Sequence, residues 1–332
     1  MLIEAFSEGP GGGNGAAVVL LTQPASTGWM QRLAGSLKQS ETAFLLQQQN
    51  QWLLRWFTPS CEVPLCGHAT LASLLALGHW DLLQPGDSLE LWTRSGPLTV
   101  SLDASSCRRG SIVLPSGALR AAPAPEALQA LLVQRLGSAA EAFWSSSLAY
   151  SVALLAVDAE LASMAGLAAV LPLELRSGLV LMQPIADTTP AAVSRPQHLD
   201  GLPLDYQLRF FAPGLGIDED PVTGSAHALV APWWQQRLDR DWVVGWQCSD
   251  RPGGVVSRAA SSGMIRLFGS GHLLWDGTLL TAPHGSAATG EVSCDFTLCD
   301  LPLCDLPPSD LPPGGSTCCD ASASWRSLLP AG

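Results

Sequence analysis

Residues 55–75 read RWFTPSCEVPLCGHATLASLL, and this stretch decides the fold. Its first three residues, an arginine and two aromatics, are typical of a strand, which Pro59 ends. After a loop the chain continues from Gly67 with Ala and Leu at helical spacing. A strand that runs through a loop into a helix presents the first N–H groups and the positive end of that helix to whatever lies in front. The stretch therefore predicts a binding site for a carboxylate at the start of this helix.

The same arrangement occurs a second time. Residues 209–230 read RFFAPGLGIDEDPVTGSAHALV, again with Arg, two aromatics, a small residue and Pro, and after a loop with Gly224, a polar residue, Ala and an apolar helical run. The second loop is three residues longer. Because strand, loop and helix start all correspond, we interpret the two stretches as an internal duplication. Two halves related by a pseudo-twofold axis would each direct a helix N-terminus at a shared cleft.

Length and charge limit the classes of function. The chain has 332 residues and 47% apolar residues, enough for the cores of two domains. Its net charge is -12 and Lys38 is its single lysine, so no basic stripe is available for nucleic acid. We recognise no secretory leader at the N-terminus, and the uncharged apolar runs are too short to cross a bilayer. We expect a cytoplasmic protein without nucleic-acid or membrane partners.

Hydrophobic spacing predicts an α+β protein whose two β-rich halves each surround one helix. Helices are expected at residues 29–37, 69–77 (ended by Gly78), 125–136 and from Gly224, the last one interrupted by Pro232. An Ala/Pro-rich linker from about Ala118 opens the second half. The expected strands are at residues 2–6, 16–21, 45–46, 52–57, 88–92, 98–102, 110–114, 148–157, 178–184, 243–247, 264–268 and 279–280.

The character of the chain changes beyond about Pro283. Residues 294–313 are a five-residue repeat, CDFTL, CDLPL, CDLPP and SDLPP, in which proline blocks both helix and central strand. We expect a disordered tail at 284–332.

The nine cysteines are an odd number in a chain without an export signal, which favours reduced thiols, and their spacings match no zinc site. No metal and no cofactor are expected.

Two residues of the first half could carry chemistry. Glu41 lies between a helix and an apolar strand, close to Phe44, where an apolar wall would raise the pKa of a carboxyl into the range useful for proton transfer. The alternative is a solvated glutamate in a turn. His68 follows the glycine at the helix start, where the dipole favours a neutral ring that forms one hydrogen bond. The alternative is a structural histidine.

The second copy offers different groups. Asp220 is held at a turn by the following proline, and Ser225 supplies a hydroxyl at the matching helix start; N-capping is the alternative role, and both can coexist. Glu219 is expected to be solvated. Cys66 and Thr223 occupy equivalent places. Two cysteines would indicate a two-thiol racemase, but with a single cysteine that symmetrical mechanism lacks its second base.

Four motifs in this order resemble one family. GNGAAVVLL at residues 13–21, SETAF at residues 40–44, RWFTPSCEVPLCGHATLAS and DEDPVTGSAHA are similar to the PhzF-like (phenazine biosynthesis-like) isomerases of the diaminopimelate epimerase-like superfamily. The resemblance covers about residues 1–283. It implies two pseudo-symmetric halves, here 1–115 and 116–283, each a β-barrel-like sheet around a central helix, and often a homodimer.

The resemblance also implies roles for single residues. The proton-shuttling glutamate of the family falls on Glu41, and its substrate-holding groups fall on His68, Asp220 and Ser225, beside the helix-start glycines Gly67 and Gly224. The expected function is a cofactor-independent isomerase that shifts a proton on a small carboxylate-bearing metabolite. Two alternatives stay open: an idle fold that binds a small molecule or protein, and an amino-acid epimerase that works through Cys66.

Overall fold

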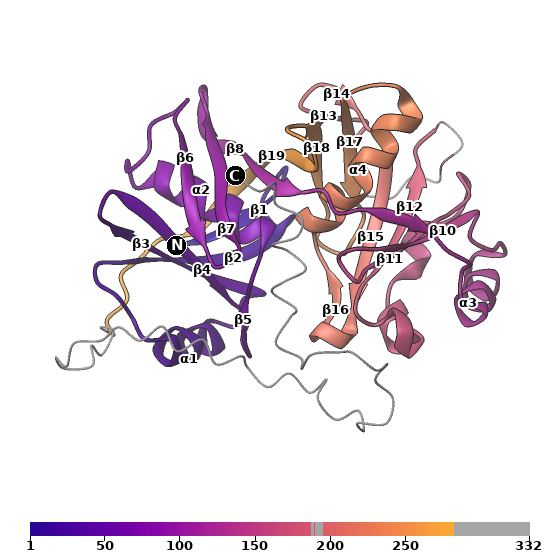
Figure 1. The fold of residues 1–332 in the computed structure, drawn as a ribbon, viewed down its shortest axis with the longest axis horizontal. Coiled ribbons are helices and arrows are strands. Elements are labelled where there is room, and N and C mark those ends of the chain that lie inside the picture. Colours follow the sequence, from indigo (N-terminus) through magenta and orange to yellow (C-terminus); the bar gives the residue numbers. More distant parts are fainter. Residues whose placement is uncertain (187–188, 190–194, 282–332) are drawn as a thin grey trace.

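The computed structural model describes residues 1–186, 189 and 195–281. Two β-rich halves lie side by side, the N-terminal half on the left of Figure 1 and the C-terminal half on the right. The expected tail, 284–332, lies outside the described residues. Within the described part of the chain, no helix is both long and apolar enough to cross a membrane.

The first half is a closed eight-stranded barrel, and its eighth strand, β19, comes from the range expected for the second half. Pairing runs in the order β1, β2, β3, β4, β6, β7, β8, β19 and back to β1, so this barrel has no free edge. Helix α2 fills it, and because it is apolar on every side, twelve of its thirteen residues are buried. The bounds are β1 Leu2–Ala5, β2 Asn14–Leu21, α1 Thr27–Leu37, β3 Glu41–Gln48, β4 Gln51–Phe57, β5 Glu62–Val63, α2 Gly67–His79, β6 Ser88–Thr93, β7 Gly96–Asp103, β8 Ser106–Pro115 and β19 Met264–Trp275.

The second half packs around helix α4, of whose fifteen residues nine are buried. Its strands pair in the order β9, β10, β11, β12, β15, β17, β18 and then join β19 of the barrel. The bounds are β9 Leu119–Ala121, α3 Glu126–Leu136, β10 Ala142–Ser146, β11 Ser151–Leu154, β12 Leu179–Pro184, β13 His198–Leu199, β14 Leu202–Pro203, β15 Tyr206–Ala212, β16 Ile217–Asp220, α4 Gly224–Leu238, β17 Trp242–Gln247 and β18 Gly253–Ala259, with single 3-10 turns at Leu161–Met164, Leu167–Val170, Leu173–Leu175 and Pro213–Leu215.

The internal duplication is confirmed by strand pairing and by side chains. Strands β2, β3, β4 and β6 pair parallel, antiparallel and parallel, and β11, β12, β15 and β17 repeat that sequence. Arg55 binds Glu62 with two hydrogen bonds of 2.8 and 2.7 Å, and Arg209 binds Glu219 with two of 2.7 and 2.6 Å. The expectation that Glu219 is solvated is wrong, because this carboxylate neutralises a buried arginine.

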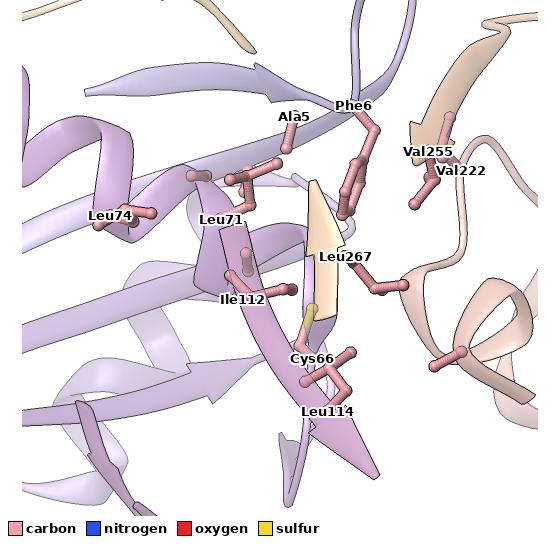
Figure 2. Close-up of a cluster of buried hydrophobic side chains, with 14 of the residues drawn as sticks. Ala5, Phe6, Cys66, Leu71, Leu74, Ile112, Leu114, Val222, Val255 and Leu267 are labelled. Atoms are coloured by element: carbon pink, nitrogen blue, oxygen red, sulfur yellow. The ribbon is translucent and has the colours of Figure 1, made fainter. Parts of the chain in front are cut away.

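One apolar core holds the halves together. Figure 2 shows the ring of Phe6 between Leu71 of α2 on one side and Val222 and Val255 of the second half on the other, with Leu267 of β19 below. These side chains belong to a single buried cluster that includes residues of both halves. The seam is therefore packed like a domain interior, and the site beside it lies on a rigid frame.

Three local predictions are wrong. Gly78 does not end α2, because it packs against β7: a Cβ there would lie 2.8 Å from Leu102 Cδ2. Residues 279–280 form no strand, and Leu280 is 97% exposed. Helix α4 continues through Pro232 for six more residues. At Gly78 a tertiary contact outweighs the local propensity.

Candidate active site

The N-termini of α2 and α4 meet at the seam. A Cβ added to Gly67 would lie 3.3 Å from the Cα of Gly224, and one added to Gly224 would lie 3.4 Å from the Cα of Gly67. A side chain at Gly67 would crowd the start of α4, and one at Gly224 would occupy the contact with α2. Glycine at both positions therefore lets two sets of unsatisfied N–H groups, and two positive helix ends, converge on one small region.

Glu41 is the first residue of β3 and its carboxyl group is buried next to α2. Its Oε2 lies 3.1 Å from Nε2 of His68, and its side chain is 9% exposed. Among the described residues this oxygen accepts no well-aligned hydrogen bond, so it remains an open acceptor in a buried place. Burial alone would raise the pKa of Glu41, but the charge of His68 and hydrogen bonds from His68, Ser40 and Cys66 together outweigh burial and lower it. The expectation of a raised pKa for this carboxyl is wrong in the unliganded protein, because sequence could not reveal the histidine contact.

His68, the second residue of α2, is held as a cation. Burial opposes its charge, yet the charge of the Glu41 carboxylate and hydrogen bonds to Cys66 and Glu41 raise the pKa of His68 well above its ordinary value. The two ring nitrogens can then donate to Glu41 on one side and to Cys66 Sγ, 3.5 Å from Nδ1, on the other. The expectation of a neutral His68 ring, made from the helix dipole, is therefore wrong. Direct contact with a carboxylate outweighs the partial charge of a helix end.

Asp220, the last residue of β16, reaches the same region from the second half. Its Oδ1 accepts a 2.7 Å hydrogen bond from Nδ2 of Asn14, and its Oδ2 accepts one from the hydroxyl of Thr223. Burial raises the pKa of Asp220 to about 6, an effect that the charge of His68 only partly offsets. Of the two acidic groups, Asp220 and not Glu41 is thus the carboxyl with the raised pKa.

The structure brings Glu41, His68 and Asp220 together, while Ser225 lies at the edge of the group. Ser225 Oγ is 3.4 Å from the hydroxyl of Tyr150.

Several polar side chains of the site were not predicted as functional. Asn14 links the two halves, since its amide donates to Asp220 and, at 3.1 Å, to the carbonyl of Val222. Ser40 Oγ lies 3.1 Å from both Asn14 Oδ1 and His68 Nε2. The motifs that contain Asn14 and Ser40 were visible in the sequence, but their contact with the opposite half was not.

Within the part of the chain that the structure describes, one set of side chains could hold a metal ion. Glu41, Cys66 and His68 each offer one such atom, all within 4.8 Å of one another. These atoms are already engaged in an ion pair and a thiol contact, and burial raises the pKa of Cys66, with the Glu41 charge adding to the effect, so the thiol stays protonated. A thiol must lose its proton to bind zinc. The expectation of no metal at this site stays a prediction.

Asp220→Asn is expected to raise the stability of the protein, relative to wild type, more at pH 7.5 than at pH 4.5. Because the folded pKa of Asp220 lies above that of the unfolded chain, its ionisation favours unfolding: wild-type stability falls as the pH rises through about 6. Raising the pKa of Asp220 from 3.8 to about 6 corresponds to a loss of at most about 3 kcal/mol in the free energy of unfolding. Urea unfolding at the two pH values measures it, with the exposed Asp218→Asn as control. Identical pH dependence in wild type and Asp220→Asn would contradict the prediction.

Comparisons with known proteins agree with this architecture. The family profile described as phenazine biosynthesis-like protein matches residues 3–259. An uncharacterized isomerase of Pseudomonas aeruginosa is 36% identical over 257 residues, which is 77% of this chain and 88% of that protein. The human phenazine biosynthesis-like domain-containing protein is 30% identical over 293 residues, 84% of this chain and 97% of its own.

A solved structure extends the likeness to three dimensions. The crystal structure of a phenazine biosynthesis protein of the PhzF family from Enterococcus faecalis superposes with a TM-score of 0.66 at 26% identity, covering 82% of this chain and 95% of the other. The profile match spans most of the chain, and it includes both helix-start motifs. This chain therefore belongs to the family of phenazine biosynthesis-like proteins.

Proposed function

We propose that this protein is a cofactor-independent isomerase that shifts a proton on a small carboxylate-bearing metabolite, with Glu41 as the acid and base. Isomerase is the function that the name of the Pseudomonas relative states. The observation that carries the proposal is the buried Oε2 of Glu41, an acceptor without an aligned hydrogen bond, placed beside two converging helix starts. This oxygen has an ion-pair partner in His68 but no aligned hydrogen bond, so it keeps a lone pair that can accept a proton from a substrate.

The reaction uses one carboxyl twice. At neutral pH Glu41 is ionised, because its pKa is lowered by His68 despite burial, so Oε2 can remove a proton from a carbon next to a double bond or carboxylate. The electron pair of the broken C–H bond moves into the conjugated system and forms an enolate-like anion. Glu41, now protonated, returns the same proton to a different carbon, which completes the double-bond shift. No electron acceptor and no second substrate is consumed.

The surrounding charges suit an anionic intermediate. The cationic His68 and the N–H groups at Gly67 and Gly224 are fixed before any substrate arrives, so stabilising new negative charge requires little reorganisation. Glu41, His68 and Asp220 are each less than 10% exposed, so bulk water is largely excluded from the reacting groups. Asp220 and Asn14 offer hydrogen bonds that hold polar groups of the substrate.

A thiol mechanism is less well supported. Burial and the Glu41 charge raise the pKa of Cys66, so the thiolate needed for attack on a C–H bond is scarce. Cys66→Ser is expected to keep the isomerase exchange rate within about tenfold of wild type, since removing an essential proton carrier costs about 10²- to 10⁴-fold. A larger loss, together with inactivation by thiol alkylation, would instead favour epimerisation through Cys66.

Deuterium exchange tests the proposal. Purified protein is incubated in heavy water with cyclic or unsaturated carboxylates, and NMR follows the loss of C–H signals. Enzyme-dependent exchange supports an isomerase. Ligand-induced stabilisation without exchange supports the alternative of a binding module. The cytoplasmic location, the homodimer and the absence of nucleic-acid or membrane partners stay predictions.

A further inference from the structure

We propose that Tyr150 and Ser225 form a second hydrogen-bonding face of the active site, opposite Glu41 and His68, and that the Tyr150 hydroxyl donates to an oxygen of the substrate anion. This inference rests on the proposed isomerase function and adds the group that the second half contributes to it. It follows from the pseudo-symmetry of the fold, because each half holds a helix-start side chain and a partner beside it.

Strand register identifies the equivalent of Glu41 in the second half. Glu41 directly precedes the residue of β3 that pairs with Phe57 of β4. Phe57 corresponds to Phe211 of β15 in the repeated motif. The residue of β12 that pairs with Phe211 is directly preceded by Gly178. At the place of the catalytic carboxyl, the second half therefore has a glycine and no side chain of its own.

The ring of Tyr150 fills the space left by that glycine. A Cβ added to Gly178 would lie 2.4 Å from Cδ1 of Tyr150 and 3.0 Å from Cε1. Tyr150 comes from the neighbouring segment just before β11, and its ring also packs against Phe210 with 4.8 Å between ring centroids. The missing carboxyl is thus replaced by a phenol whose ring is fixed on two sides.

The partner of the Tyr150 hydroxyl, Ser225, is the residue equivalent to His68. Ser225 is the second residue of α4, as His68 is the second residue of α2. The Tyr150 hydroxyl lies 3.4 Å from Ser225 Oγ, which mirrors the 3.1 Å contact of Glu41 with His68. Tyr150 and Ser225 are partly exposed, so a ligand beside the helix starts can reach this pair of side chains.

The chemistry of the second face differs from that of the first. Burial raises the pKa of Tyr150, Ser225 counteracts this, and the charges of Asp220 and Glu41 raise it further, so the phenol keeps its proton at neutral pH. A protonated phenol is a hydrogen-bond donor and not a base. Proton transfer is thereby assigned to the first half, and stabilisation of the anion is shared with the second.

Fluorine NMR tests the geometry without any substrate. The chain has two tyrosines, so protein labelled with 3-fluorotyrosine gives two resonances, which Tyr150→Phe and Tyr206→Phe assign. We expect the Tyr150 resonance to shift with a midpoint near pH 6, because it senses the ionisation of Asp220, whose pKa burial raises to about 6. In Asp220→Asn this step should be absent. Tyr206, which is fully buried and hydrogen-bonded to His227, should stay constant. A Tyr150 resonance that is flat, or unchanged by Asp220→Asn, would overturn the inference.

Exchange kinetics test the role. Tyr150→Phe removes one hydroxyl and keeps the ring, and we expect it to slow deuterium exchange about 10²-fold, the typical loss for one donor to a developing oxyanion. Tyr206→Phe should stay within about threefold of wild type, and equal melting temperatures would show that both variants fold. Exchange by Tyr150→Phe at the wild-type rate would overturn the role. If the wild type itself exchanges nothing, the isomerase proposal fails, while the fluorine titration still decides whether Tyr150 faces the site.

Discussion

Glu41→Gln is expected to lower the rate of deuterium exchange by at least about 10³-fold, close to the uncatalysed background. The amide has nearly the shape of the carboxylate but cannot accept a proton from carbon, so the step that breaks the C–H bond loses its base. The variant also removes the negative charge that, with Cys66, raises the pKa of His68, so the histidine should lose part of its positive charge at neutral pH. NMR in heavy water measures the first effect, and the histidine ring signals report the second.

A second buried glutamate provides the control for this experiment. Glu4 of β1 is 3% exposed and pairs with Arg251, but it lies outside the cluster formed by Glu41, His68 and Asp220. Glu4→Gln therefore removes a buried, ion-paired carboxylate from the same barrel without touching the proposed chemistry. We expect exchange to continue in Glu4→Gln at a rate within a few-fold of wild type. Substantial exchange by Glu41→Gln would remove Glu41 from the mechanism.

The repeated motifs made much of the architecture predictable. Strand, loop and helix start follow one another within about twenty residues, so local spacing suffices to identify both copies. The glycines at the two helix starts could be singled out for the same reason. Their contact across the seam, by contrast, depends on the packing of two complete halves, which no local pattern encodes.

The electrostatics of the site could not be predicted from sequence. The ionisation of Glu41 depends on a histidine 27 positions away in the chain, and that of Asp220 on burial at the seam, where Asn14 of the first half contacts it. Tyr150 was passed over because it stands in no motif; strand register alone relates it to the catalytic position. Contacts between segments that are distant in sequence determine these ionisation states and the place of Tyr150, whereas secondary-structure propensity depends only on residues close in sequence.

Arg209→Ala is expected to destabilise the protein by about 3–5 kcal/mol, the usual loss when one partner of a buried ion pair is removed. The arginine side chain is 2% exposed, binds Glu219 through two hydrogen bonds and donates a third, of 2.8 Å, to the carbonyl of Ala162. Its removal leaves the carboxylate without its counter-charge and the carbonyl without this donor. Urea unfolding followed by tryptophan fluorescence measures the change in the free energy of unfolding.

The duplication supplies the matched control, because Arg55 is the equivalent arginine of the first half. It binds Glu62 with the same two-bond geometry, but its side chain is 30% exposed, and Glu62 also accepts a 3.0 Å hydrogen bond from Arg94. Water and this second arginine can compensate for its loss, so Arg55→Ala should cost about 1 kcal/mol or less. Equal losses in the two variants would mean that burial does not determine the value of the pair. A clearly larger loss at Arg209 would mean that the two halves retain one ion-pair geometry but depend on it to different degrees, because the second arginine is buried and the first is partly exposed beside Arg94.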